Sequence, residues 1–504
     1  MHTQLTRFAQ RPLRELLIAA SRIALILFMG FTISACNDYD DTYQLTISSE
    51  NGSVSVSPEA DSYAAGTTVT ITATADSGYI FSGWSGDSSA TDTSITLVMN
   101  EDKTLEANYD VGVVIELAEA TNGQYTVEPE VSSGDTVAFG TEFTITATPD
   151  DGYILDSVYK MMEVVSGWED YVDESFSSPY TITTDADDAR FKIYGGDLDK
   201  YVIGAGFVAE DTWGELQETL NVVYATPGSK SLKYDVYAPP GASDLPIIII
   251  VHGGGWSVNN EDIMRGQARY LAESGRYVVA SIDYRLLTDL DDPAPTKADM
   301  MEDVYGAIAH IQENAEVYGG DPSRLILTGD SAGGQLSANT ALLAPYIGDG
   351  DYTGEIGSSY FSPSYVPSGM SVEDLKTQIS DSIIAVAPSY GAFVSSDGIG
   401  EMDPAVEPMS NIPDASERVL PPYYVQVGSE DTTVGTENVQ AFATALEDAG
   451  QEVTYVEYEG ASHAYFDWKP APDVQEVFNT VGKPALDDML TYLDAIVDAL
   501  DSDE

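Results

Sequence analysis

A single short motif restricts the fold of this chain more than any other feature. Gly-Asp-Ser-Ala-Gly at residues 329–333 directly follows the strand-like run Leu-Ile-Leu-Thr at residues 325–328. A buried parallel strand that ends in Gly-x-Ser-x-Gly and turns at once into a helix holds its serine hydroxyl on a strained turn above the sheet. The motif therefore predicts an α/β architecture in which Ser331 is an exposed nucleophile.

A second glycine motif lies upstream of the first. The apolar run Pro246 to Val251 predicts another buried strand, and His-Gly-Gly-Gly-Trp follows it at residues 252–256. Glycines in such a loop let backbone amides approach a developing negative oxygen, where each preorganised donor contributes about 10²- to 10³-fold in rate. The two motifs together indicate a serine hydrolase, and two unrelated structural turns are the alternative interpretation.

A general base for Ser331 can be found by elimination, because the chain has only four histidines. His2 lies in a segment that we expect to be removed, His252 belongs to the glycine loop, and His310 lies in a helical stretch. His463 remains, in a loop beyond a strand-like run. A loop at a strand end can bring an imidazole within hydrogen-bond distance of the serine. A surface histidine without a catalytic role is the alternative.

The carboxylate that orients the base should lie between Ser331 and His463, at the edge where parallel strands end. The apolar run Tyr423 to Gly428 is followed by Ser-Glu-Asp-Thr-Thr. Asp431 is the preferred candidate. Glu430 is the alternative, because adjacency alone does not separate the two.

The motifs HGGGW, GDSAGG, GSEDTTV and GASHAYF, in this order, resemble the alpha/beta-hydrolase superfamily. They are most similar to the hormone-sensitive-lipase-like carboxylesterases and to the group that includes acetylxylan and feruloyl esterases. This resemblance implies an α/β hydrolase fold, with a mostly parallel doubly wound sheet. It implies an oxyanion hole formed by the amides of Gly254, Gly255 and Ala332. It also implies hydrolysis of short acyl or aryl esters without a cofactor or metal.

The same resemblance leaves the substrate open, because the chain departs from the lipase-like pattern after Arg285, where many members continue Ala-Pro-Glu. Two long irregular insertions, residues 346–377 and 395–420, are expected to shape the pocket, since such segments are usually lids or binding loops. The aromatic residues expected to line the pocket are Trp256, Tyr360, Phe361 and Tyr465. Acetyl or feruloyl esters on polysaccharide are the expected substrates, and other small esters or aryl formamides are the alternative.

Charge excludes one class of partner. The chain has 83 acidic and 21 basic residues and a formal net charge of -62. Such a surface repels nucleic acid and anionic membranes. We therefore expect no nucleic-acid partner. The expectation of a small-molecule or carbohydrate-linked ester as substrate comes from the resemblance to the carboxylesterases.

The N-terminal residues 1–35 have the pattern of an export signal. Four arginines precede the apolar run Ile23 to Met29, and Ile-Ser-Ala-Cys closes the segment at Cys36. The run is short for a membrane span and has the basic and small-residue flanks of a signal peptide. The segment resembles a bacterial lipoprotein signal, which implies acylation of Cys36, the only cysteine, and anchoring to a bacterial membrane. An ordinary export signal with an incidental cysteine is the alternative.

A repeat precedes the hydrolase motifs. Residues 66–80 return as residues 140–154 with 11 of the 15 positions identical. Threonine alternates with Val, Ile or Ala in both copies, which predicts half-buried strands. We expect two small all-β modules at residues 44–110 and 111–195, and they resemble the divergent internalin-B-type repeats of bacterial surface proteins. They serve either as a spacer or as a module that binds a polysaccharide or a cell surface.

The remaining boundaries follow from these assignments: a tether at 36–43, a linker at 196–215 and a catalytic domain at 216–504. An adhesion lipoprotein with an inactive hydrolase domain is the alternative to an enzyme. We expect eight strands in the catalytic domain, near residues 221–224, 232–237, 246–251, 277–282, 324–328, 382–387, 422–427 and 453–458.

Overall fold

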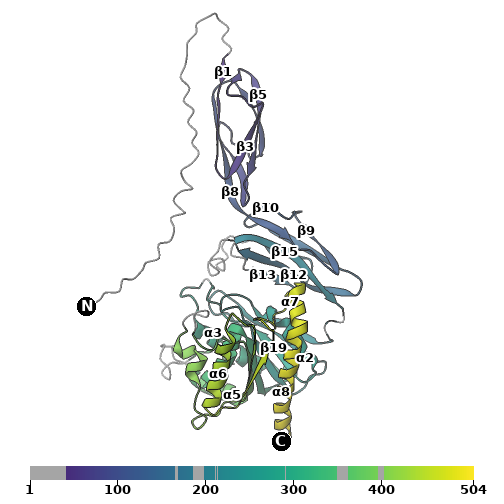
Figure 1. Ribbon diagram of the computed structural model, residues 1–504, viewed down its shortest axis with the longest axis vertical. Coiled ribbons are helices and arrows are strands. Elements are labelled where there is room, and N and C mark those ends of the chain that lie inside the picture. The colour runs from purple at the N-terminus through teal and green to yellow at the C-terminus, as the bar shows by residue number, and fades with distance from the viewer. Residues whose placement is uncertain are drawn as a thin grey trace, which may run out of the picture.

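The computed structural model describes residues 41–164, 169–184, 198–210, 212, 214–289, 291–348, 361–395 and 402–503. Two β modules are followed by a large α/β domain, with the second module between the other two units (Figure 1). The expected signal peptide and Cys36 lie outside the described residues. Within the described part of the chain, no helix is long and apolar enough to cross a membrane.

The first module is a sandwich of short strands. The antiparallel sheet β3-β5-β7 packs against a sheet in which β8 pairs with β2 and β6. The alternating pattern of β5 buries Val69, Ile71 and Ala73 against Trp84 and Leu105, while the threonines between them face outward. The strands are β1 (Thr42–Tyr43), β2 (Leu45–Ser49), β3 (Gly52–Ser57), β4 (Tyr63–Ala64), β5 (Thr67–Ala75), β6 (Tyr79–Gly86), β7 (Ser94–Met99) and β8 (Lys103–Leu117).

The strand β8 belongs to both modules. Its first half pairs with β2 and β6, and its last residues pair with β10 and β15 of the second module. The second module has the sheet β14-β11-β9 and the sheet order β10-β8-β15-β12-β13. Its own strands are β9 (Gly123–Glu128), β10 (Thr136–Ala138), β11 (Glu142–Pro149), β12 (Tyr153–Val164), β13 (Glu169–Ser175), β14 (Tyr180–Thr183) and β15 (Leu198–Ala209).

The segment 196–215, expected to be a linker, contains the strand β15. This strand pairs antiparallel with β12 and parallel with the end of β8. The first half of β8 has the corresponding place in the first module. It pairs antiparallel with β6, as β15 does with β12, and it pairs parallel with β2. The second module therefore extends to Ala209, because β15 closes it as β8 closes the first. The sequence of β15 lies outside the repeated segment, and the repeat alone did not identify it.

The α/β domain is built on an eight-stranded sheet with the order β16-β17-β19-β18-β20-β21-β22-β23. All eight expected strands are present. Strand β17 runs antiparallel to both of its neighbours, β16 and β19, and the other neighbouring strands are parallel. The isoleucines of β18 are fully buried, which stabilises the fold by about 1.5–3 kcal/mol for each side chain. The strands are β16 (Gln217–Ala225), β17 (Leu232–Ala238), β18 (Leu245–Val251), β19 (Val278–Ile282), β20 (Gly320–Asp330), β21 (Ile383–Ser389), β22 (Tyr423–Gly428) and β23 (Val453–Tyr458).

Helices cover both faces of this sheet. Helix α3 contacts both α4 and α5, and α2 contacts α8. Figure 1 shows α3 and α5 on one side of the sheet and α2 and α8 on the other. Thr296 begins α3 with a capping box that it forms with Asp299, and Gly319 ends the helix with a left-handed residue. The helices are α2 (Arg265–Glu273), α3 (Lys297–Tyr318), α4 (Ser331–Leu343), α5 (Val372–Ser382), α6 (Thr436–Asp448), α7 (Pro472–Val477) and α8 (Lys483–Asp503).

Candidate active site

Ser331 lies at the junction of β20 and α4, with no loop between the two elements. Its φ is 50°, in the left-handed region that costs a residue other than glycine about 1–3 kcal/mol. The flanking glycines make this turn possible, because a Cβ on Gly329 or Gly333 would collide with the carbonyl oxygen of Val251. The spacing Gly-x-Ser-x-Gly is therefore explained by the close approach of β18 to the turn.

The structure brings Ser331, His463 and Asp431 together in one hydrogen-bonded chain. His463 Nε2 lies 2.9 Å from Ser331 Oγ, and His463 Nδ1 lies 2.7 Å from Asp431 Oδ2. The three residues follow β20, β23 and β22, so they meet at the edge where these parallel strands end. Glu430 is exposed and only its backbone amide takes part in the loop, donating to Ala461. Of the two candidate carboxylates, Asp431 is the one that contacts the histidine.

The Asp431 carboxylate is buried and fully engaged. Its Oδ1 accepts the amides of Thr433 at 2.9 Å and Val434 at 3.1 Å, while Oδ2 faces His463. Burial raises the pKa of Asp431, but the contacts with His463 and these two amides outweigh burial and leave the pKa below its usual value. Asp431 therefore stays ionised and can hold the imidazole in the orientation in which Nε2 accepts a proton from serine.

The expected oxyanion hole consists of three backbone amides, two in the glycine loop and one in α4. Gly254 and Gly255 have φ values of 112° and 58°, which few other residues adopt. The amide of Ala332 belongs to the first turn of α4, where helix amides have no partner within the helix. Within the described residues, none of the amides of Gly254, Gly255 and Ala332 donates a hydrogen bond to another protein group. All three amides therefore have no protein acceptor within the described residues, as an oxyanion hole requires.

Asp330, the variable residue of the serine motif, fixes the glycine loop. Its Oδ1 accepts the amide of Gly253 at 2.6 Å. Burial, reinforced by the nearby Asp467, raises the pKa of Asp330 well above its usual value. This role of Asp330 was not predicted from the sequence, although its position between the strand and Ser331 was a usable signal.

Tyr390 is a second residue that the sequence did not reveal. It follows β21 at the same sheet edge, and its ring lies against His463 with 4.9 Å between ring centroids. Its hydroxyl accepts the amide of Phe466 at 3.2 Å. Tyr390 therefore packs on the imidazole and also holds the segment that follows it.

The four aromatic residues expected in the pocket have different positions. Trp256 is largely buried, its indole N–H donates to Gln335 one turn beyond Ser331, and Lys297 Nζ lies 3.5 Å from its ring centroid. Burial lowers the pKa of Lys297 to about 8. Trp256 thus lies beside the helix that carries the nucleophile.

Of the other three, Tyr465 and Phe361 are buried. Tyr465 is completely buried and packs on Tyr390 and Phe466 beneath the histidine loop. Phe361 is buried against Tyr305 of α3, and its backbone is held there because its amide donates to Tyr346 and its carbonyl accepts the amide of Gly348. Tyr360 lies outside the described residues, as do parts of both insertions.

The histidines set aside earlier have structural contacts. His252 stacks on Tyr284 with 4.2 Å between centroids, and the hydroxyl of Tyr284 donates to the His252 carbonyl. His310 Nδ1 lies 2.8 Å from the hydroxyl of Tyr234. Arg285, where the chain leaves the lipase-like pattern, pairs with Asp303 at 2.8 Å. The first contact lies in the glycine loop, and the other two join α3 to β17 and to Arg285.

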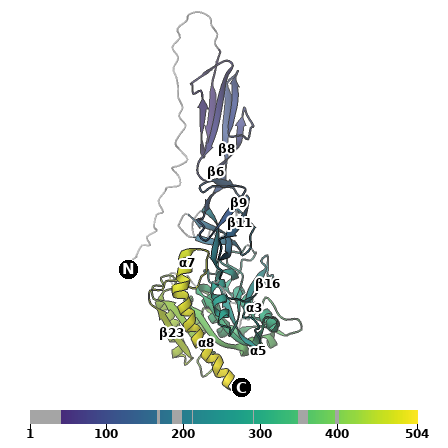
Figure 2. The same cartoon turned by 90° about the vertical axis from the view of Figure 1, so that its right-hand side faces the viewer.

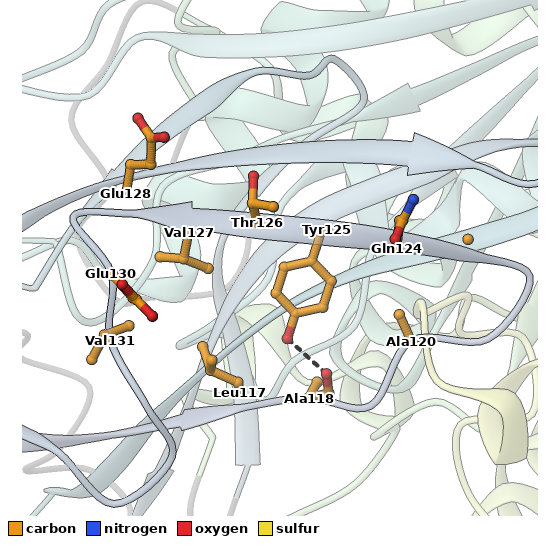
Figure 3. A pocket seen from close by; sticks show the side chains of 11 residues that line it. Leu117, Ala118, Ala120, Gln124, Tyr125, Thr126, Val127, Glu128, Glu130 and Val131 are labelled. Carbon is orange, nitrogen blue, oxygen red and sulfur yellow. Dashed lines mark hydrogen bonds between the residues drawn. The ribbon is translucent and has the colours of Figure 1, made fainter.

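A separate groove of about 620 Å³ lies in the second module (Figure 3). Its lining includes the strand β9 and the segment after β8, and the hydroxyl of Tyr125 donates to the carbonyls of Ala118 and Ile203. No serine, cysteine or histidine lines it. The lining therefore lacks the pair of serine and histidine that is present at Ser331.

Comparison with protein families agrees with this architecture. Residues 248–467 match the model of the alpha/beta hydrolase fold. This region has that fold. Residues 43–112 and 113–185 match the divergent InlB B-repeat domain. The expected fold class, an α/β hydrolase preceded by two β-rich repeat modules, is thus confirmed.

Similar proteins include several esterases. The α/β hydrolase domain is similar to carboxylesterase NlhH of Mycobacterium tuberculosis, with 40% identity over 122 residues that cover 24% of this chain and 37% of NlhH. It is similar to esterase LipQ of the same species, with 28% identity over 49% of this chain and 57% of LipQ. The chain thus spans between about a third and three fifths of these relatives. The apo form of Thermogutta terrifontis esterase 2 is 24% identical, with a TM-score of 0.41 over 55% of this chain and 94% of that one.

Proposed function

We propose that this protein is a carboxylic ester hydrolase that uses Ser331 as nucleophile, His463 as general base and acid, and Asp431 to orient the histidine. The observation that carries the proposal is the position of His463, within hydrogen-bond distance of both Ser331 and Asp431. The similarity to proteins named as carboxylesterase and esterase supports the same reaction.

The geometry suits a two-step acyl transfer. Ser331 Oγ attacks the ester carbonyl while His463 Nε2 takes its proton, and the carbonyl oxygen becomes an anion that Gly254, Gly255 and Ala332 can stabilise through their amides. Collapse of this intermediate breaks the bond to the alcohol, which leaves with the proton from His463. Water then attacks the acyl-enzyme by the same route and releases the acid.

We further propose that the substrates are short acyl or aryl esters attached to carbohydrate, such as acetyl or feruloyl groups. The support is the resemblance of the motifs to acetylxylan and feruloyl esterases, together with the aromatic Trp256 beside the nucleophile helix. A pocket discriminates by only about 1–3 kcal/mol per methylene, so the preference should be graded. Hydrolysis of other small esters or aryl formamides is the second candidate, favoured by the departure from the lipase-like pattern after Arg285.

Export and lipid anchoring through Cys36 form part of the proposal. The motif Ile-Ser-Ala-Cys after an apolar run, and the absence of any other cysteine, support it. In this setting the enzyme would be held at a bacterial membrane, with a lipid bilayer as its partner. Metabolic labelling with a fatty-acid analogue tests this: Cys36→Ser should abolish the label, and equal labelling of variant and wild type would refute the anchor.

Activity on short-chain nitrophenyl esters tests the reaction itself. Ser331→Ala should abolish turnover, and Asp431→Asn should lower kcat by roughly 10⁴-fold through loss of the correct imidazole tautomer. Glu430→Gln is the matched control and should retain nearly full activity. An inactive wild type would favour the alternative of an adhesion lipoprotein with an inert hydrolase domain.

A further inference from the structure

The two repeats carry the same β-bulge, but with different residues in it. In the first module the pairing of β6 with β8 shifts between Phe81 and Gly83, and in the second the pairing of β12 with β15 shifts between Leu155 and Ser157. The residues at the bulges are Ser82 and Asp156, which correspond when the repeats are aligned. Bulges often re-aim a side chain next to a functional site. Ser82 is exposed, whereas Asp156 is buried.

Asp156 is buried because it faces the hydrolase domain. The indole N–H of Trp468 donates to its carboxylate, at 3.2 Å to Oδ1 and 3.1 Å to Oδ2. Arg265 Nη2 lies 3.4 Å from Oδ2, and the side-chain amide of Gln475 on α7 donates to the same oxygen. Three hydrolase side chains from three segments therefore converge on one carboxylate of the second module.

A second carboxylate of the module completes this contact. Glu174 on β13 forms a bidentate ion pair with the Arg265 guanidinium, with hydrogen bonds of 2.9 and 3.2 Å. Burial raises the pKa of Glu174, although Arg265 acts against the shift. Arg265 itself is fully buried, so its charge is compensated by these two acids of the module. Buried charges persist in folded proteins only when they are paired in this way.

Close packing surrounds the charged contact. A Cβ on Gly206 of β15 would overlap Pro470, and one on Gly266 of α2 would crowd Trp468. Val208 of β15 is part of the hydrophobic core of the hydrolase domain. Both views show α7 next to the second module, and the first module away from the hydrolase domain (Figures 1 and 2). The second module is docked on the enzyme, and the first is not.

The docked residue Trp468 closes the loop that carries His463. At the beginning of the loop, the Gly460 amide donates to Ser429 Oγ, beside the Asp431 loop. At its end, the amide of Trp468 donates to Ile263 at 3.1 Å, and the Trp468 ring packs on Phe478. His463 lies between these two anchors. The second anchor is Trp468, and Asp156 accepts the hydrogen bond from its indole.

We propose that Asp156 is a positioning residue for the catalytic histidine, which makes the second repeat a structural part of the active site and not a spacer. Asp156 fixes Trp468, Trp468 fixes the end of the loop, and the loop sets the distance from His463 to Ser331. This inference rests on the proposed function, since it concerns the base of that reaction.

A graded set of variants of the full chain tests the inference. Asp156→Ala removes the acceptor, Asp156→Asn retains one oxygen, and Trp468→Phe removes only the indole donor. Misplacement of a catalytic group by about 1 Å can cost about 10²-fold in rate. We expect kcat per active site to fall about 10- to 100-fold in Asp156→Ala and by less in the other two, with KM changed less than about twofold. Ser82→Ala, the matched change in the first repeat, should leave both constants unaltered.

Counting active sites separates positioning from simple loss of folded protein. A nitrophenyl phosphotriester releases one nitrophenolate for each reactive serine and gives the concentration of competent enzyme. Unchanged kcat per titrated site in all three variants would overturn the proposal. Hydrogen exchange at the amides of residues 463–469 gives a readout that does not depend on ester turnover. Faster exchange in Asp156→Ala than in Ser82→Ala is expected, and equal exchange would overturn the proposal even if the wild type hydrolyses no ester.

Discussion

The two repeats share a sequence pattern but differ in what they contact. Both keep the alternating threonine pattern, and in both it buries one side of a strand, with Val69 and Ile71 in the first copy and Phe143 and Ile145 in the second. They differ where the strand after this pattern meets its neighbours. Strand β12 is buried on both faces over most of its length, whereas β6 has exposed positions. The shared residues build the sandwich, and the residues that differ decide what the sandwich touches.

The largest expected effect is the difference between removing the first module and removing both modules. A chain that begins at Asp110 loses the first module and should keep its kcat per active site within about twofold. A chain that begins at Gly214 exposes Trp468 and the apolar core that packs against Val208, and it should lose most of its soluble, active protein, since a large exposed apolar patch promotes aggregation. Yield, thermal midpoint and titrated activity measure the difference. Equal behaviour of the two truncated chains would break the comparison.

The next effect compares the free energy of unfolding that is lost when a buried ion pair of the second module or a surface ion pair of the first module is broken. Arg265→Leu leaves Asp156 and Glu174 buried without a cation and should lower the free energy of unfolding by about 3–5 kcal/mol. The control in the first module is Lys103→Met, which breaks the pair with the largely exposed Glu101 and should cost no more than about 1 kcal/mol. Urea unfolding followed by fluorescence measures both. Similar costs would mean that the buried cluster contributes no more than a surface pair.

Exchanging the two bulge residues should have a smaller and unequal effect. Asp156→Ser gives the second repeat the residue of the first and leaves the indole of Trp468 without its acceptor, at a cost of about 1–3 kcal/mol. Ser82→Asp makes the reverse change at an exposed position and should alter stability by less than about 0.5 kcal/mol. Symmetric effects in the two modules would contradict the docked arrangement.

The smallest effect is a pH dependence on the hydrolase side of the contact. Glu261, four residues before Arg265, is buried, and burial together with Asp283 and Asp262 raises its pKa to about 8. The folded state therefore favours the protonated carboxyl, so this stabilisation is present at low pH and is lost as the pH rises through about 8. Glu261→Gln cannot titrate, and its thermal midpoint relative to wild type should rise by about 5 °C or more between pH 5 and 9.

The matched control for this pH dependence is Glu101→Gln in the first module. Its side chain is largely exposed, and the substitution should leave the pH profile of the thermal midpoint unchanged. Parallel profiles for Glu261→Gln and wild type would show that Glu261 titrates normally.

Local patterns were sufficient to predict much of this molecule. The eight strands of the α/β domain follow from apolar runs, and Ser331, Asp431 and His463 could be chosen because each follows such a strand at a common edge. Contacts between distant segments could not be predicted in this way. Asp156 and Trp468 are 312 residues apart, and no sequence pattern near either residue predicts their contact. Phe361 and Tyr465 were expected in the pocket because aromatic side chains suit sugar rings, but the same side chains also suit a core.

The shared strand β8 has a mechanical consequence. At about 3.3 Å per residue, its fifteen residues form a continuous strut of roughly 50 Å, with no flexible joint between the modules. Tension applied at the far end of the first module acts along this strut and loads its hydrogen bonds with β2 and β15 in shear, so that many bonds resist together. The load then passes through β15 and β12 to the bulge at Asp156. By this path, we expect a pull on the N-terminal side of the protein to reach the loop that holds His463.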